Sequence, residues 1–314
     1  MNSVKTERTP KPIHVTKQKR LSRISTGDRI FDIIIYVILA LVLIFTSYPL
    51  IYVVCASFSA PAAVTAGKVY LWPVRPTLLA YKTVIGYESL WVGFTNSLLY
   101  VFVGTTFALI LDTMAAYPLS RKEFYGRGIF SITFAITMYV GGGIVPTYLV
   151  ISRLGMLDTR WAMVLPGAMN VWYVIMVRSY FQNSVPNELY EAGQLDGCSD
   201  ISYMLRILIP LSGPILAVIG LYQAVGIWNA YFNGMIYLTR KELYPLQVVL
   251  RSILMLGNID LTDIEDVEAV ENLIGLSALM KYAVIVVASV PVMIMYPMVQ
   301  RFFVKGVVVG SVKG

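Results

Sequence analysis

Residues 30–58 read IFDIIIYVILALVLIFTSYPLIYVVCASF, an apolar run that a single charged side chain, Asp32, interrupts. An α-helix rises about 1.5 Å per residue, so about 20 apolar residues cross the hydrocarbon core of a bilayer. The run is longer than this, and longer than the apolar part of a cleavable signal peptide. It therefore predicts a transmembrane helix.

The rest of the chain has a similar composition. Of the 314 residues, 57% are hydrophobic and only 14% are charged, and the mean hydropathy is +0.69, whereas about a quarter of the residues in a soluble domain are charged. The sequence therefore predicts an all-α polytopic membrane protein with six transmembrane helices. The predicted spans are residues 30–58, 94–119, 128–151, 161–181, 207–230 and 279–299.

Lysine and arginine are unevenly divided between the two sides of this predicted bundle. With six spans, both termini and the loops after the second and fourth spans share one side, which holds 16 of the 25 basic residues. An excess of Lys and Arg marks the cytoplasmic side, so we expect both termini in the cytoplasm. The opposite side carries an acidic cluster between residues 260 and 271. The net charge of +7 follows from this topology and does not indicate binding to nucleic acid.

The topology divides the chain into three parts. Residues 1–29 form a basic cytoplasmic tail, residues 30–300 a transmembrane domain, and residues 301–314 a cytoplasmic C-terminal tail. An external segment, residues 231–278, separates the last two spans, and its apolar side chains recur at the spacing of one helix face. This spacing predicts an amphipathic helix packed across the outer side. The residues of this face are Leu246, Val249, Leu250, Ile253 and Leu254.

Residue types that serve catalysis or metal binding are scarce. His14 is the only histidine and lies in the polar tail, and Cys55 and Cys198 lie at different predicted depths, so we expect no disulfide. The sequence lacks the Gly-x4-Gly-Lys-[Ser/Thr] spacing of a phosphate-binding loop, the His-Glu-x-x-His zinc motif and the Gly-x-Ser-x-Gly motif. We therefore expect no metal, no cofactor and no enzymatic activity in this chain.

Residues 186–206, between the fourth and fifth predicted spans, read PNELYEAGQLDGCSDISYMLR. The leading proline suits the first turn of a helix, and Glu188 and Glu191 favour its positive N-terminal end. Gly197 can adopt the left-handed conformation that ends a helix, and Ser199 can cap a second one. The segment predicts a short cytoplasmic helix pair, although an ordinary connector between spans would have the same pattern.

The same segment resembles the EAA loop of bacterial ABC-importer permeases, whose pattern is Glu-Ala-Ala, three residues, Gly, nine residues and Ile-x-Leu-Pro. Glu-Ala-Gly at 191–193 matches the opening, Gly197 matches the glycine, and Ile-Leu-Ile-Pro at 207–210 matches the close. The departures are Gly193 for the second Ala and Ile209 for Leu. They exchange a small residue for a small one and an apolar residue for an apolar one.

Other parts of the chain resemble the carbohydrate branch of this family, in particular the maltose permease subunit. These parts are Ala-Tyr-Pro-Leu-Ser-Arg at 116–121, Trp-Asn at 228–229 and the tail at 303–314. Gly-Gly-Gly-Ile-Val-Pro at 141–146 resembles a subgroup that imports oligosaccharides derived from plant or microbial polysaccharides. The resemblance covers about residues 30–314.

The resemblance implies the fold of a type I ABC importer permease. In that family the EAA loop is a coupling helix that sits in a cleft of a separate ATPase subunit. The resemblance implies that Glu191 pairs with a basic residue of the ATPase, that Gly197 forms the turn and that Asp196 stabilises it. The loop residues that it implies for coupling are Glu188, Glu191, Ala192, Gly193, Asp196, Gly197 and Pro210.

The function that the resemblance implies is import of an oligosaccharide through the bacterial plasma membrane. An extracytoplasmic binding protein would deliver the sugar, a second homologous permease would complete the pore, and an ATPase dimer would bind ATP and Mg²⁺. An ion-coupled secondary transporter, which works without an ATPase, is the alternative. That class predicts several intramembrane charges and an inverted repeat, whereas the predicted spans offer only Asp112.

Several residues inside or beside the spans are candidates for the translocation path. The candidates are Gly141, Gly142, Gly143, Trp228, Asn229 and Tyr231. The glycines, followed by Pro146, predict a broken helix, which either lines a path or allows close packing of helices. Aromatic rings either stack on sugars or anchor a chain at the membrane interface. Asp112 has two interpretations as well, a functional charge or a hydrogen bond between helices.

Overall fold

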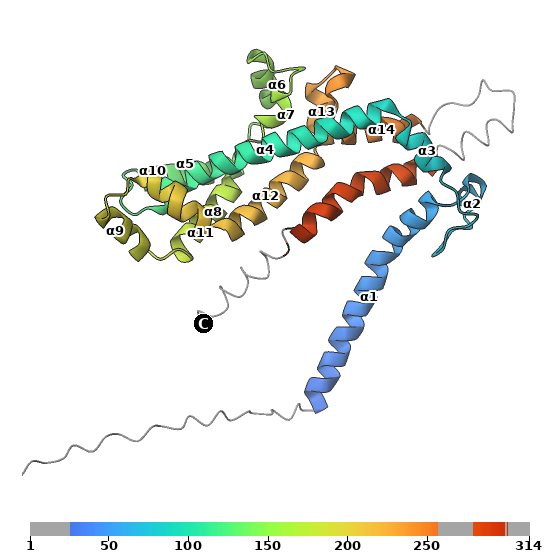
Figure 1. The fold of residues 1–314 in the computed structure, drawn as a ribbon, viewed down its shortest axis with the longest axis horizontal. Helices are drawn as coiled ribbons and strands as arrows, with labels where there is room; N and C mark the ends of the chain where they lie inside the picture. The colour runs from blue at the N-terminus through green and yellow to red at the C-terminus, as the bar shows by residue number, and fades with distance from the viewer. Residues whose placement is uncertain (1–25, 257–278, 299, 301–314) are drawn as a thin grey trace, which may run out of the picture. The chain divides into compact units, whose positions relative to one another are not determined.

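The computed structural model describes residues 26–256, 279–298 and 300 (Figure 1). Within these ranges every regular element is a helix, which confirms the predicted fold class. The chain divides into two compact units, Met1–Leu50 and Ile51–Gly314.

The described part of the first unit is the beginning of α1 (Thr26–Ser57), which corresponds to the first predicted span. From Gly27 to Leu50 every side chain except that of Ser47 is exposed, although most are apolar. An apolar surface all round a helix is what a hydrocarbon environment requires. The exposure of this helix therefore agrees with a membrane span.

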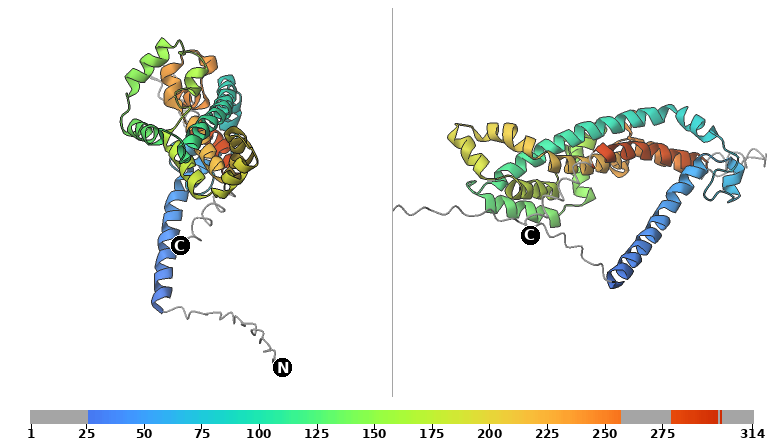
Figure 2. Two further views of the ribbon diagram at one scale, coloured as in Figure 1. Left: turned by 90° about the vertical axis from the view of Figure 1, so that its left-hand side faces the viewer. Right: turned by 60° about the horizontal axis from the view of Figure 1, so that its bottom comes forward.

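The long helix α4 (Glu88–Ser120) organises the second unit and corresponds to the second predicted span. It packs against α8 (Val171–Asn183), α12 (Gly213–Trp228) and α14 (Leu246–Leu256), as Figures 1 and 2 show. Helices α9 (Glu188–Leu195) and α10 (Asp200–Tyr203) lie at the Ser120 end of α4, and α14 lies toward its Glu88 end (Figure 1). This helix therefore connects two regions that are far apart in space.

The third predicted span is bent at its glycines. Helices α5 (Arg127–Tyr139) and α6 (Ile144–Arg153) meet at 113°. The break between them contains Gly141 and Gly142, and Gly143 has a φ of +79° at the start of α6. Because side chains with a Cβ rarely adopt this conformation, glycine at this position allows the chain to change direction.

The fifth predicted span is bent too. The helical stretch that leads into it consists of α10 (Asp200–Tyr203), η1 (Met204–Leu208) and α11 (Ile209–Leu211), and this stretch meets α12 at 80°. Pro210 lies in the first turn of α11, and Pro214 lies in the first turn of α12. Proline is tolerated in a first turn because the missing N–H has no helical partner there.

The fourth predicted span, 161–181, is not one helix, and that prediction is wrong. The chain forms α7 (Trp161–Val164) and α8, which residues 165–170 separate. This interval contains Pro166 and Gly167, two residues that disfavour a helix interior. Asn170 then caps α8, because its side chain accepts a hydrogen bond from the amide of Trp172 at 3.0 Å.

The number of spans stays a prediction. Among the described residues, three helices are long and apolar enough to cross a membrane, Gly27–Ser57, Glu88–Ser120 and Leu279–Met298. The number rises to five if each bent pair forms one span. Neither α7 nor α8 reaches the length of a span.

The segment after α12 contains α13 (Tyr231–Tyr237), η2 (Lys241–Leu243) and α14. Helix α14 confirms the predicted amphipathic helix, because four of its five predicted apolar residues are buried and Leu254 is half-buried. The acidic cluster at 260–271 lies outside the described residues, as do 1–25 and 301–314. The buried residues are Leu246, Val249, Leu250 and Ile253.

Side chains near the Glu88 end of α4 form hydrogen bonds with main-chain carbonyls in the segment between α13 and α14. The amide group of Asn96 donates to the carbonyl of Glu242 at 2.7 Å. The hydroxyl of Tyr100 donates to the carbonyl of Leu243 at 2.8 Å. Both side chains are buried, so these bonds satisfy polar groups that water does not reach.

A second attachment joins the loop after α6 to the loop before η2. The carboxylate of Asp158 accepts hydrogen bonds from the amides of Thr239 at 2.6 Å and Arg240 at 3.0 Å, and from the Thr239 hydroxyl. These bonds lower the pKa of Asp158 to about 2, and the bond from the Thr239 hydroxyl has the largest effect. The two loops are therefore tied by an ionised carboxylate.

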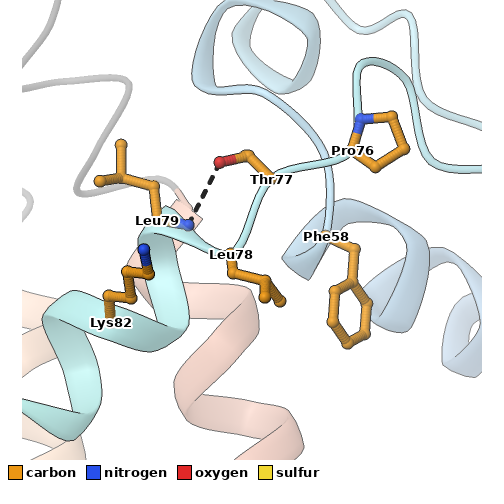
Figure 3. Close-up of a pocket in the computed structure, with 6 residues that line it drawn as sticks. All are labelled: Phe58, Pro76, Thr77, Leu78, Leu79 and Lys82. Carbon is orange, nitrogen blue, oxygen red and sulfur yellow. Dashed lines mark hydrogen bonds between the residues drawn. The ribbon is translucent and has the colours of Figure 1, made fainter.

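The connection between α1 and α4 contains α2 (Pro61–Thr65) and α3 (Leu79–Ile85). A cavity of about 460 Å³ lies beside the start of α3 (Figure 3). The amide of Leu79 donates to the Thr77 hydroxyl at 3.2 Å, a local hydrogen bond beside the start of the helix. The residues that line the cavity are Phe58, Pro76, Thr77, Leu78, Leu79 and Lys82.

Candidate functional site

The segment 186–206 forms the predicted helix pair, and its first helix is α9 (Glu188–Leu195). Gly197 lies two residues after the end of this helix and has a φ of +74°. The amide of Gly197 donates to the carbonyl of Gln194 at 3.0 Å, and that of Cys198 donates to the carbonyl of Gly193 at 2.9 Å. These two bonds are those of a glycine-terminated helix end, so the predicted left-handed turn at Gly197 is confirmed.

The second helix of the pair is α10, which Ser199 caps by accepting a hydrogen bond from the amide of Ser202 at 3.3 Å. The carboxylate of Asp200 accepts from the Tyr190 hydroxyl at 2.9 Å and from the Gln194 amide group at 3.2 Å. Burial raises the pKa of Tyr190, and the hydrogen bond to Asp200 raises it further. The side chain of Asp200 therefore ties α9 to α10.

Gly193 faces the inside of the pair. A Cβ at this position would lie 3.4 Å from the ring of Tyr203 and 3.8 Å from the Cβ of Cys198. Gly193 is buried, whereas Leu189 and Ala192 are exposed. Gly193 therefore serves the packing of α9 on α10, and Ala192 is the small residue that remains on the open face.

The charged residues of α9 are exposed. The amide group of Asn187 donates to the carboxylate of Glu191 at 2.9 Å, which orients that side chain. Glu188 is exposed in the first turn, and Asp196 is exposed at the end of the helix. The structure thus gathers the predicted loop residues on one short helix and its turn, with the exception of Pro210, which lies in α11.

A residue that the sequence analysis assigned to no site joins this pair to α4. Arg121 follows α4, and its guanidinium carbon lies 4.1 Å from the ring centroid of Tyr190, 4.9 Å from that of Tyr203 and 5.2 Å from that of Tyr117. We call these four residues the Arg121 cage. No local pattern could have revealed it, because two of the rings come from a distant part of the sequence.

The candidates for the translocation path occupy different environments. Trp228 is 1% exposed, donates from its indole to the carbonyl of Ala288 at 3.1 Å and packs edge-on against Phe94. The structure therefore places Trp228 in the core. Asn229 and Tyr231 are exposed, and Asn229 contributes to the lining of a cavity of about 390 Å³.

The three glycines of the third span are exposed in this chain. A Cβ at Gly141 or Gly143 would meet none of the described atoms within 4 Å. Their role in close packing therefore finds no support among the described residues, whereas their role in breaking the helix is evident. Their place on a translocation path stays a prediction.

Asp112 is buried within α4, and its carboxylate accepts a hydrogen bond from the amide of Asn170 at 3.0 Å. Asn170 is the residue that caps α8 after the interruption of the fourth predicted span. The bond therefore joins two helices at the point where one of them begins. This geometry favours the structural interpretation of Asp112.

Comparisons with known proteins find relatives that align with most of the chain. No protein-family model matches the chain. Protein LplC of Bacillus subtilis (strain 168) is 36% identical over 288 residues, which cover 92% of this chain and 96% of LplC. The inner membrane ABC transporter permease protein YcjP of Escherichia coli (strain K12) is 30% identical over 95% of this chain and 99% of its own length. The chain belongs to the ABC transporter permease family.

Two further comparisons concern carbohydrate transport. The polygalacturonan/rhamnogalacturonan transport system permease protein YtcP of Bacillus subtilis (strain 168) is 35% identical over 91% of this permease and 99% of its own length. A chain in the crystal structure of a bacterial ABC transporter that imports the acidic polysaccharide alginate superimposes with a TM-score of 0.81 at 34% identity. That match covers 89% of this permease and 98% of the other chain. The protein is thus a permease subunit, the non-catalytic membrane component of an ABC importer.

Proposed function

We propose that this permease translocates an oligosaccharide through the bacterial plasma membrane. The support is the function that the names of its relatives state, because both YtcP and the structural neighbour belong to systems for carbohydrate polymers. Their lengths match that of this permease, so the similarity extends over the whole transmembrane region.

The open face of α9 is the observation that carries the coupling role. Leu189 and Ala192 form a small apolar surface there, and the carboxylates of Glu188 and Glu191 are exposed beside it. A rigid helix with this surface suits a cleft that supplies a basic residue. We assign the face to an ATPase dimer, which binds ATP and Mg²⁺ outside this chain.

Two other partners and an orientation complete the proposal. A second homologous permease forms the other half of the pore, and an extracytoplasmic binding protein delivers the sugar. Both termini and the helix pair face the cytoplasm, because the side that holds them carries 16 of the 25 Lys and Arg residues.

The variant Glu191→Ala tests the coupling role in the reconstituted complex. We expect weaker ATPase association or slower sugar-stimulated ATP hydrolysis by about tenfold, because a partly buried charge pair across an interface contributes about 1–3 kcal/mol. The matched control is Glu242→Ala, which removes the same charge from an exposed residue outside the pair. The measurements are ATPase copurification, ATP hydrolysis and uptake of labelled oligosaccharide.

Two outcomes would contradict the proposal. Equal activity of both variants and the wild type would remove the role of Glu191. Sugar uptake by proteoliposomes that contain this permease without an ATPase, driven by an ion gradient, would instead support a secondary transporter.

A further inference from the structure

The Arg121 cage joins three elements of the permease at one point. Tyr117 belongs to α4, Tyr190 to α9 and Tyr203 to α10, and Arg121 directly follows α4. The rings of Tyr190 and Tyr203 meet edge-on with centroids 5.1 Å apart. One guanidinium therefore contacts both helices of the coupling pair and the end of the longest helix in the second unit.

The cage holds its cation by rings rather than by a carboxylate. The Nε atom of Arg121 is buried and has no hydrogen-bond partner among the described residues. The carboxylate of Asp200 is instead engaged by Tyr190 and Gln194. A planar guanidinium stacks on aromatic faces, which a compact ammonium does less well, so the site specifies arginine over lysine.

Apolar contacts also join the pair to α4. Tyr203 is 1% exposed and packs in a cluster with Ala116 and Leu119 of α4. Such contacts are non-directional, whereas a cation over a ring is confined to the ring faces. The position of α9 and α10 along α4 therefore depends on where Arg121 holds their rings.

We propose that Arg121 is a positioning residue that couples the helix pair to α4, so that displacement of the pair by the ATPase is passed to the span. The coupling part rests on the proposed function. In this arrangement the open face of α9 receives the movement, the Arg121 cage transmits it, and α4 carries it toward α12 and α14 as one continuous helix.

The functional test uses Arg121→Met in the complete complex with its ATPase, second permease and binding protein. Methionine keeps much of the side-chain volume but removes the cation. We expect the ATPase to copurify and the amount of sugar transported per ATP hydrolysed to fall about tenfold, with Arg121→Lys between this variant and the wild type. The matched control is Lys122→Met, because Lys122 is exposed beside the cage and carries the same charge.

A distance measurement tests the positioning role without any activity. Spin labels at Tyr125→Cys and Leu195→Cys report the separation of the loop after α4 from the pair, and both positions are almost fully exposed. The background replaces Cys55 and Cys198 by alanine. We expect a narrow distance distribution with Arg121, a broader one with Arg121→Lys and the broadest with Arg121→Met.

The outcomes separate the two proposals. An unchanged distance distribution in both Arg121 variants would overturn the positioning role, and so would wild-type transport per ATP in Arg121→Met. If Arg121→Met fails to insert, the same two measurements on Arg121→Lys decide. A wild-type complex that neither binds an ATPase nor transports sugar would refute the proposed function, while the distance distributions would still decide the positioning role.

Discussion

The two ends of α4 are held in different ways. At the Glu88 end, Asn96 and Tyr100 bind main-chain carbonyls of the segment before α14, and Gly93 brings α14 into direct contact. At the Ser120 end, directional contact with the coupling pair is concentrated on Arg121. A distributed attachment tolerates the loss of one side chain, whereas a concentrated one does not. Under the proposed coupling role, the Glu88 end of α4 stays in place and the Ser120 end follows the ATPase.

A larger side chain at Gly93 would overpack the contact between α14 and the Glu88 end of α4. A Cβ at Gly93 would lie 2.9 Å from the Val249 side chain and 3.2 Å from the Cα of Leu246. We expect Gly93→Leu to lower the free energy of unfolding by about 3 kcal/mol, because the backbone of α14 must move to admit the side chain. Unfolding in detergent, followed by circular dichroism, measures this change.

The control for this prediction is Gly128→Leu. Gly128 lies in α5, and a Cβ there would meet none of the described atoms within 4 Å. We expect the free energy of unfolding of this variant to equal that of the wild type or to exceed it slightly, because leucine has a higher helix propensity than glycine. Equal unfolding of Gly93→Leu and Gly128→Leu would show that α14 does not depend on its close approach to α4.

The turn of the coupling pair allows a smaller and more selective test. Gly197 has a φ of +74°, and a Cβ there would meet none of the described atoms within 4 Å, so only the backbone conformation opposes a side chain. We expect Gly197→Ala to destabilise the folded turn by about 1 kcal/mol of free energy and Gly197→Val to destabilise it more, since β-branched residues tolerate this conformation least. ATPase copurification should fall in that order, with insertion of the spans unchanged.

Asparagine provides the control at this position, because it adopts the left-handed conformation more readily than other residues with a Cβ. Gly197→Asn should therefore retain most of the ATPase. Wild-type association by both the alanine and the valine variants would refute the docking geometry of the pair.

The smallest expected effect concerns acid and the Asp158 attachment. The pKa of Asp158 is about 2 in the folded chain, below its usual value of 3.8. Its contribution to stability is therefore complete above about pH 4 and disappears as the pH falls through about 2. Hydrogen exchange of the Thr239 and Arg240 amides, corrected for intrinsic rates, should show constant protection from about pH 8 to about pH 5 and a progressive loss of protection as the pH falls from about 4 to about 2.

The variant Asp158→Ala sharpens this prediction. It removes the acceptor of both amides, so their protection should fall at neutral pH, while that of the α4 amides should not. Wild-type protection that stays constant down to about pH 2 would mean that these hydrogen bonds do not lower the pKa of the Asp158 carboxyl.

Local features of the permease could be predicted because their causes lie within a few residues. The apolar run at 30–58 is longer than a bilayer requires, and α1 results. The spacing of Leu246, Val249 and Leu250 predicts the buried face of α14. Gly197 ends α9 because the capping bonds join residues of the same turn. Hydrophobic length, helical periodicity and turn chemistry are thus properties of the sequence itself.

Tertiary structure decided what depends on distant partners. Asp112 of α4 binds the amide of Asn170 at the start of α8, a contact between residues that are 58 positions apart in the sequence. The indole of Trp228 is of a type that stacks on sugar rings, but α4 and the helix Leu279–Met298 enclose it. Arg121 meets Tyr190 and Tyr203 only after the chain has folded back on α4. The sequence determined which segments become helices, and packing determined which side chains meet, because a contact requires two surfaces and a sequence pattern describes only one.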